Sequence, residues 1–434
     1  MVDKKIMIAA IAVVAVVVVA GCAVMLTGGK GGSSGGDDTG DALGLVYGNA
    51  NGDNKIDSAD LEIIEKITNG DLKFSDYPLA DANRDGKVDN NDYGKVLDFI
   101  DGKSMTVYVK DSSQTVKSVK YPINGIFATG GTNSRVVYQV LDLEDKMVAN
   151  ATNDYISPLL DKTLYDKRAN GDIKVVTTGA TTADFTELSK LTFSLAIVEY
   201  SGMNTGYLDD KGSQWFSDFG VDVLAISADN FEELEKAVTT IGILVGSETQ
   251  AKQLTDMLDN TLSTIKTKLG SKYGTATVMD IVMSNSVSGT DADYYHLTEL
   301  AGGKNLADWS DSTRAFDPAK DPWLYDSKYN PDYLVHYRSM TYGDTVDKST
   351  LSGFVPYFQK TAAYMAGDYY LINGAAPLPV RLAYTASVMY QDDLDANWYM
   401  EIFQDYVDTF CENSWNVSDY KIAWNTEEIN AILG

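Results

Sequence analysis

Residues 247–270 read SETQAKQLTDMLDNTLSTIKTKLG, and this stretch decides the fold. Its apolar side chains recur at the three- and four-residue spacing of a helix, at Ala251, Leu254, Leu258, Leu262, Ile265 and Leu269. Ser247 and Gln250 have the spacing of a capping box, and Gly270 ends the pattern. About 22 residues at ~1.5 Å each make a helix roughly 33 Å long. We therefore predict a rigid spine helix that joins the regions on either side of it.

Both of these regions alternate predicted strands with predicted helices, which is typical of parallel α/β layers. The strands are predicted over residues 121–129, 174–177, 195–198 and 221–226 before the spine, and over 275–283, 333–337 and 369–372 after it. We therefore predict a first α/β lobe over residues 105–246, the spine over 247–270 and a second α/β lobe over 271–434.

Residues 49–60 and 81–92 repeat one pattern, with oxygen-bearing side chains at positions 1, 3, 5, 9 and 12 of each loop. Calcium needs six to eight oxygens around one point, and this spacing lets a looping backbone supply them. Gly86 at position 6 suits a sharp turn, and Asn54 at the same position of the first loop tolerates a left-handed backbone. We predict two calcium ions, held by Asn49, Asn51, Asp53, Asp57 and Asp60 with the carbonyl of Lys55, and by Asp81, Asn83, Asp85, Asp89 and Asp92 with the carbonyl of Lys87.

Each loop leads into one short amphipathic helix, and each has aspartate rather than glutamate at position 12. In these features, residues 45–103 resemble a type I dockerin, a module that plugs into cohesin domains. In that family, loop positions 10 and 11 help to select the partner. They are Ser58-Ala59 and Asn90-Asn91 here, so the two halves differ. The resemblance implies either a cohesin partner or a calcium-stiffened spacer.

The first 26 residues carry a targeting signal. Lys4 and Lys5 precede an uncharged apolar run over residues 6–26, which is long enough to cross a bilayer and leaves the rest of the chain outside. The residues around Cys22 resemble a lipoprotein cleavage box, so an uncleaved anchor and a lipidated Cys22 both stay open. Residues 27–44 are rich in Gly, Ser and Asp and read as a flexible linker, which argues against a buried core helix here. We expect an extracytoplasmic protein anchored to the cell membrane.

Composition and missing motifs exclude several functions. The chain has 35 basic and 62 acidic side chains, and the net charge of −27 repels nucleic acid. His296 and His336 are the only histidines, too few for a bare zinc or manganese site, and we expect His336 to be structural. Neither histidine accompanies a nucleophile motif, and phosphate-binding and dinucleotide fingerprints are absent from the sequence. We therefore expect a binding protein and not an enzyme.

A family resemblance rests on the order of several short motifs. FGVDV at 219–223 and IGILVGSE at 241–248 precede the spine, and LAGGKN at 300–305 and NPDYLV at 330–335 follow it. Over residues 120–412 the chain resembles the substrate-binding proteins of iron-siderophore and cobalamin importers. The resemblance implies two lobes with little hinge motion, a ligand held between them, and an ABC permease and ATPase as partners. That family usually presents one docking glutamate per lobe, where this chain has Arg135 and Leu324.

Candidate ligand-binding residues follow predicted strands, because such loops line the crevice of an open α/β sheet. They are Thr132 at a helix N-terminus that favours an anion, the aromatic residues Tyr200, Tyr207, Trp309 and Tyr342, and the arginines Arg314, Arg338 and Arg381. Arginines hold oxygen-rich groups and tyrosines stack on flat macrocycles. We expect capture of a small chelate or macrocycle, such as an iron-siderophore, cobalamin or a haem-like compound, for an ABC importer. The alternative is a surface scaffolding or adhesion protein whose lobes bind a cell-wall or polymer component.

Overall fold

A computed structural model of the chain describes residues 42–152, 157–176, 184–200, 205–228, 230–290, 292–308, 314–315, 330–340 and 346–434. All of these residues belong to one unit of the chain, which spans residues 39–434. The predicted anchor, with Cys22, and most of the predicted linker lie outside the described residues. Among the residues that are described, no helix combines the length and the apolar character needed to cross a bilayer.

The first lobe is built on a five-stranded sheet in which every pair of neighbours is parallel. Its order is β5-β4-β3-β6-β7, with β3 (Ile126–Gly130), β4 (Met147–Thr152), β5 (Lys174–Val175), β6 (Leu195–Glu199) and β7 (Asp222–Ile226). The lobe's helices are α3 (Thr132–Val140), α4 (Lys162–Asn170), α5 (Phe185–Leu188), α6 (Thr205–Leu208) and α7 (Asp210–Asp218). Every residue of β3 and β6 is buried, so these two strands form the centre of the lobe.

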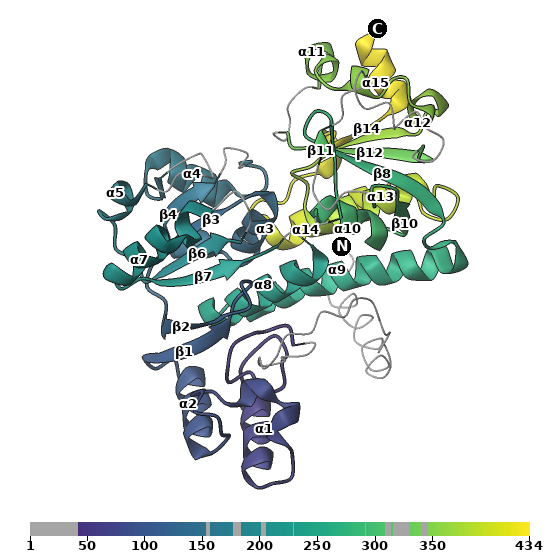
Figure 1. Cartoon of the computed structure of the whole chain (residues 1–434). Coiled ribbons are helices and arrows are strands. Elements are labelled where there is room, and N and C mark those ends of the chain that lie inside the picture. The colour runs from purple at the N-terminus through teal and green to yellow at the C-terminus, as the bar shows by residue number, and fades with distance from the viewer. Residues whose placement is uncertain are drawn as a thin grey trace, which may run out of the picture. The chain divides into compact units, whose positions relative to one another are not determined.

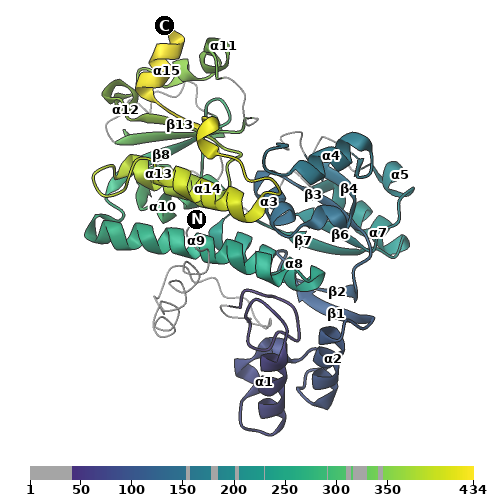
Figure 2. The ribbon, with the colours of Figure 1, turned by 180° about the vertical axis from the view of Figure 1, so that it is seen from behind.

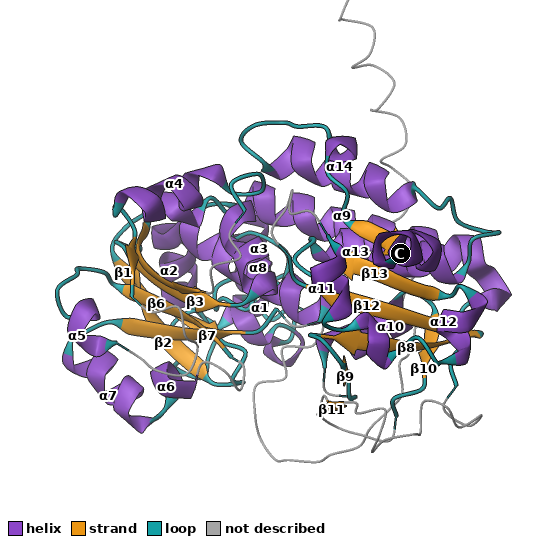
Figure 3. Ribbon diagram, turned by 90° about the horizontal axis from the view of Figure 1, so that it is seen from above, coloured by secondary structure: helices purple, strands orange, loops and turns teal. Residues whose placement is uncertain are grey.

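The second lobe has a seven-stranded mixed sheet in the order β11-β9-β8-β12-β13-β14, with β10 also paired to β8. The strands are β8 (Ala276–Val282), β9 (Ser286–Val287), β10 (Gly303–Asn305), β11 (Arg314–Ala315), β12 (Tyr333–Arg338), β13 (Tyr369–Asn373) and β14 (Ala423–Asn425). The lobe's helices are α10 (Asp293–Leu300), α11 (Lys348–Ser352), α12 (Ala362–Ala366), α13 (Leu378–Met389), α14 (Trp398–Phe410) and α15 (Thr426–Leu433). Figure 3 shows helices on both faces of each sheet, which buries both sides of the parallel strands.

Two helices lie between the sheets in sequence, α8 (Phe231–Val245) and α9 (Glu248–Leu269). Figure 1 shows α9 as a long straight helix, and from behind α13 lies between it and the second-lobe sheet (Figure 2). Helix α9 also contacts α3 of the first lobe, so it packs against both lobes. The helix predicted over this stretch is confirmed, because Ala251, Leu254, Leu258, Ile265 and Leu269 are buried along one side.

The start of α9 differs from the predicted capping box. In the described part of the chain, Ser247 makes no side-chain hydrogen bond to the helix start. Its hydroxyl instead donates to the carbonyl of Leu141 at 3.1 Å, and the Gln250 amide donates to Asp142 at 3.4 Å. The capping-box prediction is therefore wrong. Both side chains reach back to the end of α3, where they tie the spine to the first lobe.

The two acidic loops precede α1 (Ser58–Thr68) and α2 (Asn90–Ile100), with short 3-10 turns over Phe74–Asp76 and Pro78–Ala80 between them. A hairpin of β1 (Met105–Lys110) and β2 (Val116–Tyr121) follows. The single strand predicted over residues 121–129 is thus two strands, because Pro122 lacks an N–H and ends β2, while β3 begins only at Ile126.

One hydrophobic core runs from the two-loop segment into the first lobe. It includes Ile64 and Val96 from α1 and α2, Val109 from the hairpin, and Ile241 from α8. Phe99 stacks on Tyr121 with ring centroids 4.5 Å apart, and the N–H of Leu45 donates to the Thr240 hydroxyl at 3.1 Å. The two-loop segment is therefore packed against the lobe as part of the same core.

Candidate ligand site and calcium loops

Strand order locates the ligand side of each lobe. In open α/β sheets, ligands bind beyond the carboxyl ends of the strands at the point where the strand order reverses. In the first lobe the order reverses between β3 and β6, which lead into Gly131 and Tyr200. In the second lobe, the order of the parallel strands is β10-β8-β12-β13, and it reverses between β8 and β12. Strand β8 leads into Met283, and strand β12 ends at Arg338. These residues mark the expected ligand side of the two sheets.

In the first lobe, a carboxylate occupies the start of α3. The Glu199 carboxylate accepts hydrogen bonds from the Gly131 N–H at 2.8 Å and from the Ser134 hydroxyl at 2.9 Å. The N-terminus of a helix favours negative charge, and Glu199 supplies it from the end of β6. Nothing is described of the Thr132 side chain, but the helix start that the sequence analysis assigned to a ligand anion is already capped by the protein. An anionic ligand group would meet like charge here.

The lobes meet through side chains of three helices. The Asn133 amide on α3 donates to the Asp293 carboxylate on α10 at 3.3 Å, and Arg381 on α13 donates to the Asn133 carbonyl oxygen. The Arg381 guanidinium also lies 5.2 Å from the ring centroid of Tyr294. Burial raises the pKa of Asp293, and the charge of Arg381 opposes that rise. Arg381 is 1% exposed, and its Nε finds no hydrogen-bond partner among the described residues.

In the second lobe, the end of β8 is held in an uncommon conformation. Met283 has a φ of +56°, a region that costs a residue with a Cβ about 1–2 kcal/mol, and its side chain is 64% exposed. Its carbonyl accepts from His336 Nε2 at 2.7 Å, while His336 Nδ1 lies 2.6 Å from the Tyr369 hydroxyl. Burial lowers the pKa of His336 to about 3, so the ring is neutral. The prediction of a structural role for His336 is confirmed.

Arg338, at the end of β12, lies beside this turn. Its guanidinium donates to the Ser284 hydroxyl at 3.3 Å and lies 5.3 Å from the ring centroid of Phe354. The side chain is partly buried. The hydrogen bond to Ser284 uses only one of the five N–H groups of the guanidinium. The other N–H groups could bind two oxygen atoms of a ligand at once.

The two acidic loops share one set of internal hydrogen bonds. Asp60 accepts from the N–H groups of Asn51 at 3.1 Å and Asp57 at 2.8 Å. Asp92, at the same position of the second loop, accepts from the N–H groups of Asn83 at 3.0 Å and Asp89 at 2.8 Å. Burial raises the pKa of Asp60 to about 6 and also raises the pKa of Asp92. Both position-12 carboxylates are thus turned into their loops.

Position 1 distinguishes the loops. Asp81 accepts from the N–H groups of Asp85 at 3.1 Å and Gly86 at 2.8 Å. Asn49 donates its amide to the carbonyl of Gly44 at 2.9 Å and to that of Asp53 at 2.7 Å. Its carbonyl oxygen, Oδ1, is buried and finds no hydrogen-bond partner in the described part of the chain. A buried carbonyl oxygen without a hydrogen-bond partner is suited to coordinate a hard cation such as calcium.

The two loops turn at different positions. Positive φ occurs at position 4 of both loops, at Gly52 (+70°) and Arg84 (+59°), and at position 6 only in the second loop, at Gly86 (+86°). Asn54 would tolerate a left-handed backbone but does not adopt one. Across the described ranges, no group of three or more His, Cys, Asp or Glu side chains is placed to hold a metal ion.

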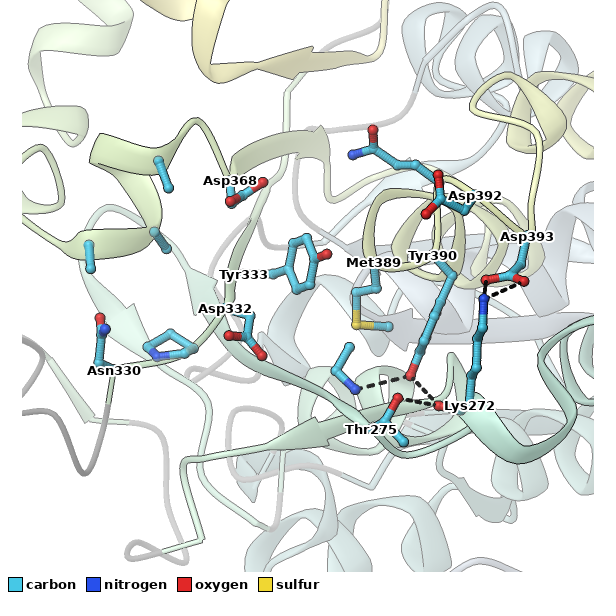
Figure 4. A pocket seen from close by; sticks show the side chains of 16 residues that line it. Lys272, Thr275, Asn330, Asp332, Tyr333, Asp368, Met389, Tyr390, Asp392 and Asp393 are labelled. Atoms are coloured by element: carbon cyan, nitrogen blue, oxygen red, sulfur yellow. Dashed lines mark hydrogen bonds and ion pairs between the residues drawn. The ribbon is translucent and has the colours of Figure 1, made fainter.

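A separate pocket of about 730 Å³ lies at the opposite, amino ends of β8, β12 and β13. Figure 4 shows Asp332, Asp368 and Asp392 around it, with Lys272 in an ion pair with Asp393 at 2.7 Å. Burial raises the pKa of Asp368, and the charge of Asp332 adds to the rise. The pocket is therefore acidic. It lies at the amino ends of the strands, whereas the ligand is expected at their carboxyl ends.

Comparisons with known proteins agree with this architecture. A family model described as "Periplasmic binding protein" matches residues 126–373, which is more than half of the chain. The chain belongs to this family. Its members are solute-binding proteins of transport systems and not enzymes, so this periplasmic binding protein is an extracytoplasmic solute-binding protein for an ABC importer. No curated protein matches the chain.

Solved structures share the fold of this periplasmic binding protein at low identity. The TroA-like periplasmic binding protein FepB from Veillonella parvula is 15% identical with a TM-score of 0.57, covering 73% of this chain and 99% of its own. The Helicobacter pylori CeuE in complex with nickel and histidine is 17% identical with a TM-score of 0.55, covering 73% and 99%. The molybdate-bound MolA from Haemophilus influenzae is 13% identical with a TM-score of 0.55, covering 71% and 98%. The predicted two-lobe α/β fold is confirmed.

The predicted ligand residues fall into three groups. Tyr200, Arg338 and Arg381 lie at the reversal points or at the contact between the lobes. Tyr207 is buried in the first-lobe core, with its ring 5.1 Å from Phe127, so the structure places it away from any surface. Arg314 belongs to β11, but nothing is described of its side chain, and Trp309 and Tyr342 lie outside the described residues together with Leu324.

Sequence reasoning missed five residues of this region, namely Asn133, Glu199, Met283, Asp293 and Tyr294. Glu199 carried a usable signal, because an acidic residue that ends a wholly apolar strand needs a partner for its charge. Asn133, in the Gly-Gly-Thr-Asn turn after β3, carried a weaker one.

Proposed function

We propose that this periplasmic binding protein captures a chelated metal or a corrinoid, such as an iron-siderophore, cobalamin or a haem-like compound, between its lobes. The observation that carries the proposal is Arg381, a buried guanidinium at the contact between the lobes whose Nε is left without a partner by the described residues. A buried charged donor is costly unless it is paired, and a ligand oxygen would pair it. Arg338 offers a second cation at the reversal point of the second lobe.

The opposite charges of the two lobes narrow the class of ligand. Glu199 supplies a carboxylate from the first lobe, whereas Arg338 and Arg381 supply cations from the second. A metal chelate combines a positive centre with oxygen-rich groups at its periphery, which suits this division. The CeuE structure holds nickel with histidine and the MolA structure holds molybdate, so other members of this fold bind metal compounds.

The experiment is native mass spectrometry of the full-length protein purified without added ligand, followed by competition with candidate chelates. We expect a bound species of small mass whose retention drops when Arg381 is replaced by Gln. The matched control is Tyr165→Ala, which changes an exposed first-lobe residue of α4. A protein that retains no small molecule, and binds none of the chelates in any variant, would refute the proposed ligand class.

We also propose that the two acidic loops bind two calcium ions and that residues 45–103 form a dockerin-like module. The matching hydrogen bonds around Asp60 and Asp92 and the unpartnered oxygen of Asn49 support this proposal. Bound calcium would supply positive charge where the loops gather carboxylates. A membrane anchor over residues 1–26, either spanning or lipidated at Cys22, belongs to the same proposal and is tested by membrane fractionation of wild type and Cys22→Ser.

One observation favours the alternative function, a surface scaffolding or adhesion protein. On α2, Tyr93, Leu97 and Ile100 form an apolar stripe with each side chain 36–41% exposed. The residues at the same repeat positions of α1 are Leu61, Glu65 and Thr68, which form no such stripe. Exposed apolar stripes mark interaction sites, so a cohesin-type partner would dock on α2. Binding of cohesin domains that Leu97→Asp abolishes and Glu65→Gln preserves would support this reading, and no binding by the wild type would refute it.

A further inference from the structure

Helix α8 carries two buried oxygen-bearing side chains that lack partners. Glu235 is 8% exposed and Thr239 is 0% exposed. Within the described ranges, neither Glu235 Oε1 nor the Thr239 hydroxyl has a hydrogen-bond partner. The two residues are four positions apart, so they lie next to each other on the same side of the helix. Buried polar atoms are paired in nearly all native structures, so two unpaired ones on one helix face require an explanation.

That face of α8 packs against α9. Gly242 continues the face by one more turn, and a Cβ at Gly242 would lie 2.9 Å from the Cβ of Ala251. At the other end of the contact, the carboxylate of Asp259 acts on Glu235. Burial first, and then this like charge, raises the pKa of Glu235 to about 8. Gly242 lies near Ala251, and Glu235 interacts electrostatically with Asp259. The earlier residue of α8 thus meets the later residue of α9, so the two helices run antiparallel.

If residues are counted along the same antiparallel register, Thr255 of α9 falls at the position that faces Thr239. Thr255 is buried, and its hydroxyl donates to the Lys252 carbonyl at 3.1 Å, so its oxygen can still accept or coordinate. Burial also raises the pKa of Asp259, to which the charge of Asp256 contributes. We call Glu235, Thr239, Thr255 and Asp259 the α8–α9 oxygen cluster. It combines the buried carboxyl group of Glu235, the exposed carboxyl group of Asp259 and the two buried threonine hydroxyls along the contact of α8 with α9.

Lys266 opposes the pKa rise of Asp259 through its charge, and two other nearby lysines are paired elsewhere. Lys236 forms an ion pair with Glu232, and Lys252 forms one with Asp256, each with its partner on its own helix. Lys236 and Lys252 oppose the pKa rises of Glu235 and Asp259 only as minor contributions. Among the residues that the structure describes, no ion pair joins Glu235 or Asp259 to a basic side chain. The cluster therefore has no bonded counter-charge that would keep its two carboxyl groups ionised.

We propose that the α8–α9 oxygen cluster binds one calcium ion, at a site separate from the two acidic loops. Carboxylate and hydroxyl oxygens are ligands of hard cations, and two carboxylates balance a divalent charge. Calcium fits better than magnesium because it accepts irregular coordination, whereas magnesium demands near-ideal octahedral geometry. The ion would satisfy the two unpaired oxygens of α8 and fasten α8 to the spine helix α9.

The test counts bound calcium per chain in the full-length protein by equilibrium dialysis and elemental analysis. We expect Glu235→Gln to bind one ion fewer than the wild type. Glu232→Gln, which changes an exposed carboxylate on the same helix, should bind the same number as the wild type. The acidic loops contribute equally to all three proteins, so the difference reports the cluster whether or not the loops bind calcium.

A second variant keeps the proposal testable if Glu235→Gln fails to fold. Thr239→Val keeps both carboxylates and removes one hydroxyl, and we expect it to weaken the affinity of one calcium ion at least about tenfold. Equal calcium counts and equal affinities in all variants would overturn the proposal and indicate that Glu235 holds a proton instead. Magnesium binding in preference to calcium at the Glu235-dependent site would overturn the assignment of the ion.

Discussion

Replacing Arg381 with Met tests the contact between the lobes. Methionine keeps much of the buried volume of the side chain but removes its positive charge. The Asn133 carbonyl oxygen then loses its charged donor, and Asp293 loses the cation that opposes the rise of its pKa. A hydrogen bond to a charged group is worth about 1.5–3 kcal/mol, and a buried charge left alone costs several kcal/mol more before it relaxes. We expect a loss of about 3 kcal/mol in the free energy of unfolding at neutral pH.

The sign of the pH dependence follows from Asp293. Its pKa in the folded protein is already above the ordinary value, so the protonated form favours the folded state, and this contribution is lost as the pH rises through the folded pKa. Without Arg381, that pKa rises further. The deficit of Arg381→Met should therefore be largest at neutral pH and should shrink as the pH falls toward 4.

The assay is urea unfolding of the wild type, Arg381→Met, Asp293→Asn and the double variant at several pH values. In the double variant the unpaired charge is gone, so we expect it to recover more than half of the stability that Arg381→Met loses. A double variant as unstable as Arg381→Met, or a deficit that does not change with pH, would refute the reasoning. Either result would mean that lost packing, and not the unpaired Asp293 charge, controls the stability of this contact.

Three further outcomes are expected. Chelation of calcium should lower the melting temperature of the full chain in one shared transition, because the loop segment and the first lobe have one core. Asp85→Ala, which changes the second loop only, should remove part of this response in calorimetry. Arg338→Ala should weaken ligand binding at least about tenfold, whereas Tyr200→Ala should cost nearer 1 kcal/mol, as measured by titration calorimetry. Burial, aided by the charge of Asp161, raises the pKa of Glu144 to about 8, so stability should fall as the pH rises from about 4.5 to 8. Glu144→Gln should flatten that fall in thermal unfolding curves, while a control at the exposed Asp145 should not.

The parts predicted from sequence are those set by local pattern. The helix over Glu248–Leu269 follows from an unbroken apolar repeat, and the two loops follow from a spacing that occurs twice. Position relative to a strand was a weaker guide, because Tyr200 and Tyr207 both follow β6 and only Tyr200 is exposed. Nothing local marks which way such a side chain turns.

The contacts between the lobes could not be predicted in this way. Asn133 is 160 residues from Asp293 and 248 residues from Arg381, so only the packing of α3 against the second lobe brings the three together. The capping box failed for a similar reason. Ser247 and Gln250 have the right spacing, but the end of α3 offers their side chains partners at Leu141 and Asp142 that a single helix does not contain.

The carboxylate of Glu199 has a consequence for selectivity. The carboxylate is attached to β6 and already accepts hydrogen bonds at the start of α3. Because it belongs to the same chain, its effective concentration is high, and it competes with any free anion for these donors. Free phosphate and sulfate would have to displace it and bear its repulsion, so the first lobe should ignore these abundant ions. A ligand that presents a cationic or neutral face to this lobe meets no such obstacle. If the proposed ligand site is right, we expect Glu199 to disfavour common inorganic anions at the first lobe.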